Sequence, residues 1–326
     1  MKRIMLITTG GTIACKKSEA GLSPVMDSRE LLRFVPSVRE LCEPLALTLM
    51  NKDSTEIVPQ DWLMMAAAVR EHYDSCDGFV ITHGTDTMAY TAAALSYLIQ
   101  SSPKPVVLTG SQRPIDADIN DARQNLLDAF RCAADGRAHG VCLVFDGKVI
   151  AGTRAKKMNT KSYNAFASVN YPLLAEIRDS RMFTYIERPY AEEPAFYGSL
   201  CERVALVKLA PSSTGGLLEH ALEVSDGVVV ESFGTGGLPE RLYGALERAA
   251  AAGKLIVATT QVPGEGSDMA VYKVGREIKR RLGLLESYDM TLEATLAKLM
   301  WALAASDSRE EQRALFNTPV GEDMLT

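Results

Sequence analysis

Four short apolar runs in this sequence each lead directly into a turn rich in Gly, Thr and Ser. The central run, residues 79–81, enters the polar segment 82–87 and is followed by a helix-like stretch over 88–98. The other three apolar runs cover residues 4–7, 45–50 and 106–108. Helix capping alone would explain Thr and Asp at one such turn, but not the recurrence. Since ligands of parallel sheets bind beyond the carboxyl ends of strands, we expect the four turns to meet at one sheet edge.

Length and charge limit the classes of function. The 326 residues suffice for two ordinary domains, and a net charge of −6 provides no basic surface for nucleic acid. No window approaches the roughly 20 apolar residues of a membrane span. The apolar run 4–7 is shorter than the core of a signal peptide, so we interpret it as a first strand.

The spacing of the cysteine and histidine residues gives no indication of a metal or cofactor site. The six cysteines form no C-x-x-C pair and the four histidines show no H-E-x-x-H spacing. We interpret the cysteines as reduced thiols and expect a cytoplasmic protein with neither metal nor organic cofactor.

Strand and helix patterns alternate in two blocks. We predict an α/β fold with two domains: residues 1–187 with a larger, mostly parallel sheet flanked by helices, and residues 204–326 with a smaller parallel α/β domain. The Pro- and Glu-containing segment 188–203 is the predicted linker. Residues 10–26 read as a long loop and 321–326 as a frayed end.

Known phosphate and serine-hydrolase motifs are absent. The segment 10–18 lacks the second Gly of a P-loop, and neither G-x-G-x-x-G nor G-x-S-x-G occurs. Hydroxyl catalysis without histidine remains: Thr12 follows a Gly-Gly turn, which exposes its oxygen and aims N–H groups at an oxyanion. Thr85, Asp86 and Lys157 are candidates for a proton relay, although an adjacent Asp opposes the lowering of a Lys pKa.

Two long motifs then give a specific resemblance. Residues 8–14 (TTGGTIA) and 81–88 (ITHGTDTM), with the later segments 109–112 (TGSQ), 154–157 (RAKK) and 288–294 (YDMTLEA), resemble the bacterial-type L-asparaginase family in order and spacing. The similarity runs from about residue 3 to about 317 and is strongest to the cytoplasmic (type I) branch.

The resemblance implies roles for individual residues. Thr12 matches the nucleophile, while Thr85, Asp86 and Lys157 match the group that supports the second hydroxyl. The substrate-binding positions that the family implies are Gly11, Ser54, Thr55, Thr85, Asp86 and Ser111. Among these, Gly11 offers a backbone N–H to the oxyanion, and Ser111 falls where family members offer a backbone group to the leaving amide.

The implied reaction is hydrolysis of L-asparagine to L-aspartate and ammonia by double displacement through an aspartyl ester. Minor glutaminase activity is a further expectation, because one methylene gives only about 1–3 kcal/mol of discrimination. Family members are typically homodimers or homotetramers, so we expect one of these assemblies.

The sequence departs from the family pattern at several positions. Leu22 stands where many members have a Tyr in the loop after the first motif; Tyr288 and Tyr272 are candidate substitutes. Gly237 stands where many members have Asn. Glu231 and Val262 occupy the positions of an Arg and a Cys that accompany allostery in some cytoplasmic relatives.

Two alternative readings stay open. One is the amidotransferase component that acts on misacylated tRNA, which carries an extra N-terminal domain for which we expect no room before residue 8. The other is a sensor that binds asparagine or aspartate without turnover. A sensor does not require a nucleophile, so the presence of Thr12 and Lys157 favours an enzyme.

Overall fold

The computed structural model describes residues 1–18 and 21–325, and of residues 17, 18, 21, 22 and 24 it describes the backbone alone. The chain divides into two compact units, Met1–Gly198 and Ser199–Thr326. The division falls inside the segment 188–203, where the sequence analysis puts the linker.

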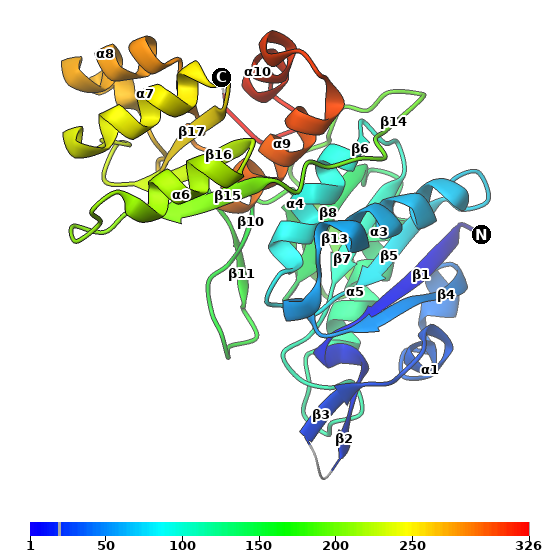
Figure 1. Ribbon diagram of the computed structural model, residues 1–326. Helices are drawn as coiled ribbons and strands as arrows, with labels where there is room; N and C mark the ends of the chain where they lie inside the picture. Colours follow the sequence, from blue (N-terminus) through cyan, green and yellow to red (C-terminus); the bar gives the residue numbers. More distant parts are fainter. Residues whose placement is uncertain (19–20, 326) are drawn as a thin grey trace. The chain divides into compact units, whose positions relative to one another are not determined.

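The first unit is built on an eight-stranded sheet with the strand order β13-β12-β9-β8-β7-β5-β1-β4 (Figure 1). Five neighbouring strands are parallel: β4 (Glu43–Lys52), β1 (Arg3–Gly10), β5 (Gly78–Thr82), β7 (Pro105–Thr109) and β8 (Gly140–Phe145). Three antiparallel strands complete the sheet: β9 (Lys148–Ala151), β12 (Ala175–Arg178) and β13 (Arg181–Thr184). The mostly parallel sheet that the sequence predicts is therefore confirmed.

Helices cover this sheet because alternate strand residues on each face are apolar. On one face, Ile4, Leu6 and Val80 join a core with residues of α1 (Ser28–Arg33), α2 (Val38–Leu41) and α5 (Ala122–Ala134). The other helices of the unit are α3 (Pro59–Glu71) and α4 (Met88–Leu98), which pack on each other. Ten residues of α4 are buried, so it is an interior helix of the unit.

The predicted loop over residues 10–26 is wrong. The chain forms a short 3₁₀ helix η1 (Thr12–Ala14) and then an antiparallel hairpin of β2 (Cys15–Ser18) and β3 (Gly21–Pro24). Alternating small and polar residues gave no apolar pattern from which to predict this hairpin. Four further short strands form two pairs within the unit: β6 (Ile99–Gln100) with β14 (Ala195–Phe196), and β10 (Ala155–Lys157) with β11 (Phe166–Ser168). A second 3₁₀ helix, η2 (Ser54–Glu56), follows β4.

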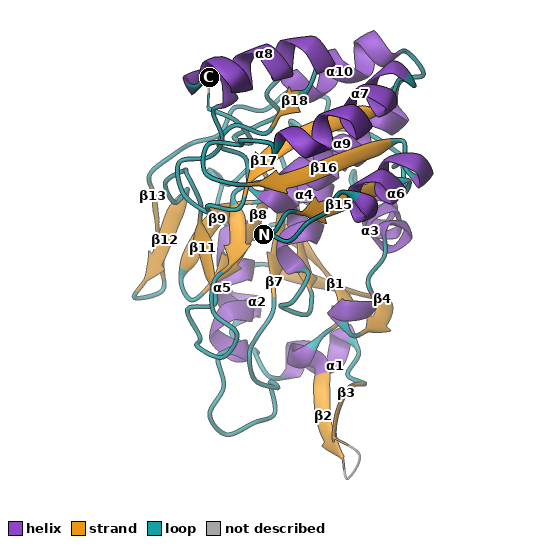
Figure 2. Ribbon diagram, turned by 60° about the vertical axis from the view of Figure 1, so that its left-hand side comes forward, coloured by secondary structure: helices purple, strands orange, loops and turns teal. Residues whose placement is uncertain are grey.

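The second unit has a four-stranded, fully parallel sheet surrounded by helices (Figure 2). Its strands are β15 (Val204–Lys208), β16 (Gly227–Ser232), β17 (Leu255–Thr260) and β18 (Leu285–Glu286). Its helices are α6 (Gly216–Val224), η3 (Glu240–Leu242), α7 (Tyr243–Ala251), η4 (Met269–Val271), α8 (Lys273–Leu282), α9 (Leu292–Ala305) and α10 (Arg309–Asn317). This confirms the smaller parallel α/β fold predicted for the C-terminal part.

The C-terminal residues are anchored rather than frayed. The Nζ atom of Lys298 lies 2.8 Å from Asp323 Oδ2 and 2.8 Å from the carbonyl oxygen of Thr318, and both charged side chains are fully buried. Leu325 donates its backbone N–H to Asp289 Oδ1 at 3.0 Å. The prediction of a frayed end is wrong for residues 321–325, because a buried ion pair is invisible to local charge patterning.

Candidate active site

Two glycines bring the two sequence motifs into direct contact. Gly11 directly follows β1 with a φ of 76°, and a Cβ added there would lie 2.3 Å from the backbone nitrogen of Gly84. No side chain fits such a gap, so the turn after β1 and the turn after β5 touch through their backbones. The strands β1 and β5 are parallel neighbours, so the prediction that their carboxyl ends share one edge is confirmed for this pair.

The turn after β4 contacts both of these turns. Gly11 donates its N–H to the carbonyl oxygen of Lys52 at 3.0 Å, and a Cβ on Gly84 would lie 2.6 Å from Ser54 Oγ. Thr87 holds this turn by donating its hydroxyl to the Ser54 carbonyl at 2.6 Å. Ser54 is buried, whereas the neighbouring Thr55 is exposed.

The Thr55 hydroxyl lies 2.7 Å from Asp53 Oδ1. This hydroxyl and the backbone N–H of Thr55 lower the pKa of Asp53. Asp53 therefore stays ionised and holds Thr55 at the start of η2.

A lysine from a distant hairpin completes the polar cluster. Lys157, the last residue of β10, donates from Nζ to Thr85 Oγ1 at 2.7 Å and to Asp86 Oδ1 at 2.6 Å. The Lys157 side chain is 16% exposed and that of Asp86 is 60% exposed. Thr85 is buried, so its oxygen accepts from an ammonium group in a mostly dehydrated place, while Asp86 keeps a carboxylate in solvent.

Thr12 lies at the first position of η1, directly after the Gly10–Gly11 turn, and is half-buried. Within the described part of the chain no hydrogen bond engages its hydroxyl, which leaves this oxygen free to act on a ligand. Its neighbour Gly11 contacts Gly84, which directly precedes Thr85. The two predicted hydroxyls therefore stand on adjoining turns.

The turn after β7 is held by side-chain hydrogen bonds that the sequence analysis did not predict. Ser111 is buried and donates its hydroxyl to the Arg113 carbonyl, so its side chain serves the turn. Asp121 accepts from the backbone N–H groups of Gln112 and Arg113 at 2.9 and 3.1 Å. Burial raises the pKa of Asp121, while these hydrogen bonds oppose the shift.

Gln112 links this turn to the Lys157 cluster. Its Oε1 lies 3.5 Å from Thr85 Oγ1, and its Nε2 donates to the Ser162 carbonyl at 3.1 Å. The Thr85 hydroxyl, which accepts from Lys157, has its own proton left to donate in this direction. The motif at 109–112 contains Gln112, but only the folded chain shows what it contacts.

A buried histidine supports the central turn. His83 is fully buried; its Nδ1 lies 2.7 Å from the Gly84 carbonyl and its Nε2 lies 2.9 Å from Thr91 Oγ1. A carbonyl only accepts, so Nδ1 carries the proton and Nε2 accepts from Thr91, whose oxygen in turn accepts from Trp62 Nε1 at 2.9 Å. Burial lowers the pKa of His83 to about 4, so the ring is neutral at physiological pH.

Several strand-end hydroxyls do not reach the site. Thr9 donates to the Thr82 carbonyl at 2.8 Å and Thr109 to the Val144 carbonyl at 2.8 Å. The Thr8 and Thr82 hydroxyls are buried without a hydrogen-bond partner in the described chain. The prediction that the four turns meet at one sheet edge is confirmed, because β4, β1, β5 and β7 are parallel neighbours. The hydroxyls of these strand residues, however, are bound to carbonyls or buried and do not serve that edge.

The departures from the family pattern lie as follows. Leu22 pairs with Lys17 in the β2–β3 hairpin, and its side chain lies outside the described part. Tyr288 accepts a hydrogen bond from Lys279 Nζ at 3.0 Å, and Tyr272 is 66% exposed. Both tyrosines belong to the second unit.

The remaining departures are also in the second unit. Gly237 forms an isolated bridge with Phe233. Glu231 is buried beside Lys208 at 3.2 Å, whereas Val262 is exposed.

Across residues 1–18 and 21–325, no helix is long and apolar enough to cross a membrane. The same residues contain no group of three or more His, Cys, Asp or Glu side chains placed to hold a metal ion.

Comparison with known proteins assigns the class. Residues 3–190 match the family model "Asparaginase, N-terminal", and residues 203–316 match "Glutaminase/Asparaginase C-terminal domain". Together these cover most of the chain and define a two-domain α/β amidohydrolase. The chain belongs to the L-asparaginase family, which confirms the predicted resemblance and its type I branch.

Individual relatives agree along nearly the whole chain. The L-asparaginase of Thermococcus kodakarensis is 38% identical over 326 residues, covering 99% of both chains, and its solved structure superposes with a TM-score of 0.94. L-asparaginase I of Vibrio cholerae has a TM-score of 0.87 at 30% identity, covering 100% of this chain and 99% of its own. A glutamyl-tRNA(Gln) amidotransferase component of Pyrococcus abyssi is 32% identical over 98% of this chain and 76% of its own.

Proposed function

We propose that this protein hydrolyses L-asparagine to L-aspartate and ammonia through a covalent ester on Thr12. The observation that carries the proposal is the Lys157 ammonium, which contacts both Thr85 Oγ1 and Asp86 Oδ1 beside the turn that bears Thr12. The similarity to proteins named L-asparaginase supplies the substrate.

Substrate binding follows from the charges and hydroxyls at the edge. The exposed Asp86 carboxylate suits the α-ammonium group of asparagine, and the Ser54–Thr55 turn suits its α-carboxylate. The Ser111 side chain is committed to its own turn, so the leaving amide contacts that turn's backbone.

The chemistry proceeds in two halves. The Thr12 oxygen attacks the side-chain amide carbon, and backbone N–H groups of the adjoining turns hold the oxyanion, since the Gly11 N–H is already donated to the Lys52 carbonyl. The Thr12 proton passes to the amide nitrogen, which leaves as ammonia. Water then cleaves the β-aspartyl ester. Lys157 donates to Thr85, which fixes the Thr85 oxygen and directs its proton away from the lysine, toward Gln112 and the ligand.

The nucleophile is tested with Thr12→Ala. The expected loss of ammonia release is at least about 10³-fold with the fold intact, because the covalent route is removed. Thr8→Val, on the strand β1 that precedes Thr12, is the matched control: its hydroxyl is buried without a partner in the described chain, so full activity is expected. A Thr12→Ala enzyme with near-normal turnover would disprove the assignment.

Trapping the intermediate distinguishes the two hydroxyls. Acid quenching during turnover, followed by peptide mass spectrometry, is expected to find the aspartyl ester on Thr12. An ester on Thr85 would exchange the roles of the two threonines.

Ammonia release measured in parallel with L-asparagine, L-glutamine and D-asparagine separates the functional readings. We expect rapid release from L-asparagine and slower release from L-glutamine. A rise in melting temperature with asparagine but no release would favour the sensor. Release that requires a charged tRNA would favour an amidotransferase, a reading that the Pyrococcus relative keeps open.

We further propose that the protein acts in the cytoplasm as a homodimer or homotetramer. A Campylobacter jejuni relative described as a probable cytoplasmic L-asparaginase supports the first part, at 26% identity and a TM-score of 0.85. Light scattering coupled to gel filtration tests the second part, and a monomer that is fully active would contradict it.

A further inference from the structure

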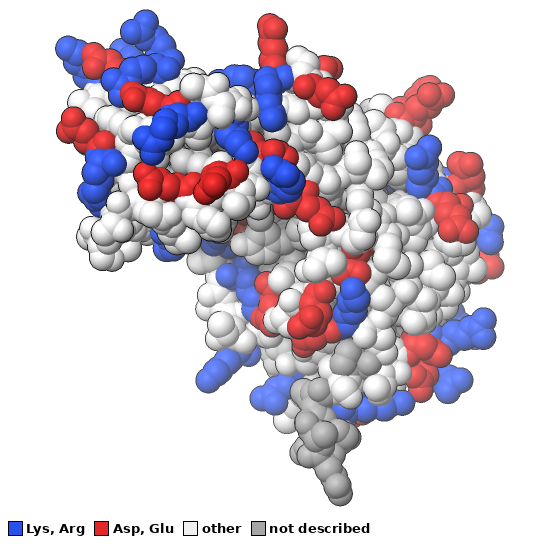
Figure 3. Space-filling model, viewed as in Figure 1, with Lys and Arg blue, Asp and Glu red and all other residues white. Residues whose placement is uncertain are grey.

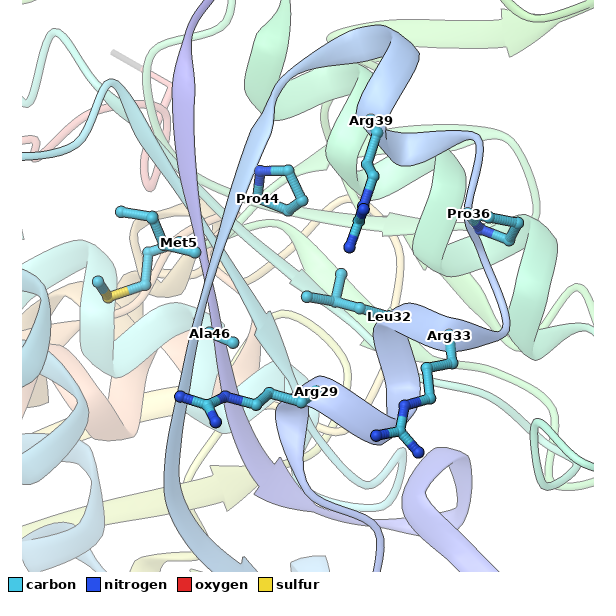
Figure 4. A pocket seen from close by; sticks show the side chains of 9 residues that line it. Met5, Arg29, Leu32, Arg33, Pro36, Arg39, Pro44 and Ala46 are labelled. Carbon is cyan, nitrogen blue, oxygen red and sulfur yellow. The ribbon is translucent and has the colours of Figure 1, made fainter.

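Beside β4 lies a pocket of about 840 Å³ at the opposite end of the strand from the proposed active site (Figure 4). Its apolar residues come from the start of β4, from β1 and from α1 with the following turn: Pro44, Leu45, Ala46, Met5, Leu32 and Pro36. At about 3.3 Å per strand residue, Ala46 and Lys52 are separated by roughly 20 Å. The pocket is therefore separate from the turn that bears Ser54.

Among the described residues that line this pocket, three arginines are the only charged ones. Arg29 and Arg33 come from α1 and Arg39 comes from α2. In Figure 4, Arg39 reaches from one side toward Leu32, Arg29 extends from the other side toward Ala46 on β4, and the guanidinium of Arg33 points away from both. Charged side chains of both signs are interspersed on the face shown in Figure 3, and the chain's net charge is −6. A pocket lined by arginine without acid is thus unlike the protein as a whole.

Nearby acids do not neutralise these arginines. Glu30 is bound to Lys16 at 3.1 Å and to the backbone of Asp27, and Glu43 lies 4.0 Å from Arg3. Among the described residues, no ion pair or hydrogen bond engages the guanidinium groups of the pocket, and the exposed Glu40 is not among its lining residues.

Local helix electrostatics explains only part of this arrangement. Arg33 and Arg39 lie in the last turns of their helices, where a cation is favoured, but Arg29 lies in the first turn of α1, where it is disfavoured. Arg29 and Arg33 are also four residues apart on one helix, a spacing at which like charges repel. A bound anion would remove both costs.

We propose that this pocket binds a small molecule that carries a pyrophosphate group on an aromatic or apolar body, such as a nucleoside diphosphate. Guanidinium groups bind phosphate oxygens in a bidentate manner, and the exposed side chains of Arg29, Arg33 and Arg39 can reorient toward an anion with several charges. The apolar floor accommodates the uncharged part of the ligand, and the volume lies within the ordinary range of small-molecule sites.

Calorimetric titration at low salt tests the site with four probes: inorganic phosphate, pyrophosphate, ADP and adenosine. We expect one site per chain, with affinity decreasing from ADP to pyrophosphate to phosphate and no binding of adenosine. Equal binding of adenosine and ADP, or no binding of any anion at millimolar concentration, would overturn the proposal.

Charge-matched variants locate the binding. Arg29→Ala, Arg33→Ala and Arg39→Ala are each expected to weaken ADP binding about tenfold or more, because each removes charge-assisted hydrogen bonds. Arg280→Ala removes the same charge from an exposed position in α8 and is expected to change nothing. An equal loss with Arg280→Ala would show attraction by net charge alone and overturn the assignment.

Gel filtration of the same variants examines the competing use of this surface, since β4 is the edge strand of its sheet. A change of oligomeric state in the arginine variants, without any anion binding in the parent protein, would assign the surface to a second copy and overturn the proposal.

Discussion

Two lysine–aspartate pairs, one in each unit, have nearly the same length and opposite surroundings. Lys157 lies 2.6 Å from Asp86, whose side chain is 60% exposed, whereas Lys298 lies 2.8 Å from Asp323 with both side chains fully buried. The first pair shares its lysine with a threonine hydroxyl, and the second shares its lysine with a backbone carbonyl.

The difference shows what each pair does. Burial lowers the pKa of Lys298, although Asp323 opposes the shift. Keeping these charges inside the unit therefore costs free energy, and the pair holds the C-terminal residues in place. The open pair costs little to maintain and contributes little to stability. Its carboxylate stays available to a ligand, as the proposed mechanism requires.

The largest effect is expected when the Lys157–Asp86 pair is disrupted, and it is an effect on catalytic activity. Lys157→Met leaves Thr85 without its ammonium donor, and turnover is expected to fall about 10²- to 10⁴-fold with little change in the unfolding midpoint. Lys148→Met removes a lysine that lies 3.8 Å from Asp146 in the same unit and is the control. Activity within about twofold of the parent in Lys157→Met would remove this lysine from the mechanism.

The buried pair is expected to behave in the opposite way. Lys298→Met leaves Asp323 charged and buried, so the free energy of unfolding is expected to fall by about 3–5 kcal/mol in urea titrations. Lys298→Met combined with Asp323→Leu removes both charges and is expected to recover most of that loss. If the double variant is as unstable as the single one, the cost arises from packing rather than from the stranded charge.

His83 makes the stability of the fold depend on pH in the acidic range. Its pKa is about 4 when folded and about 6.5 when unfolded, so the unfolded chain takes up the proton first as pH falls. The stabilisation by the neutral ring is complete above about pH 6.5 and is lost as pH falls through about 4. The total is roughly 3 kcal/mol.

The measurement compares urea unfolding of the parent and His83→Gln at pH 7.5 and pH 4.5. Carboxyl groups titrate in both proteins, so the difference between the two pH slopes isolates the histidine. Parallel slopes would show that His83 is accessible to protons in the folded state.

The sequence predicts those strands well that are buried on both faces of the sheet. The apolar runs at 79–81 and 106–108 became β5 and β7, because a parallel strand covered on both faces must be apolar throughout. The β12–β13 hairpin was missed: Glu176, Arg178 and Arg181 interrupt its apolar pattern, and its turn uses Asp179 and Ser180 at positive φ instead of glycine.

The site was predictable as a set of residues but not as a set of contacts. Gly11 and Gly84 could be assigned to turns from local pattern, yet their direct contact depends on the pairing of β1 with β5. The roles of His83 and Asp121 come from partners and burial set by packing, which no local spacing encodes.

The smallest effect is expected at Gln112, which links the open lysine pair to the rest of its unit. Gln112→Ala removes the weak 3.5 Å contact with Thr85 and the 3.1 Å bond to Ser162, so kcat is expected to fall only about three- to tenfold. Gln112→Glu keeps an oxygen facing Thr85 but cannot donate to Ser162. Gln124→Ala, which loses a 2.9 Å bond to Asp128 on α5, is the control.

These variants separate two explanations for the open geometry of the lysine pair. If Gln112→Glu retains kcat and Gln112→Ala does not, the Thr85 proton needs an acceptor, and the cluster works as a directed hydrogen-bond chain from Lys157 to Thr85 to Gln112. If both variants lose activity equally, the bond to Ser162 is what matters, and Gln112 acts by holding the segment after β10 against the site. In either case the Lys157–Asp86 pair depends on neighbouring residues that contribute little to the free energy of unfolding. The buried Lys298–Asp323 pair does not depend on such neighbours.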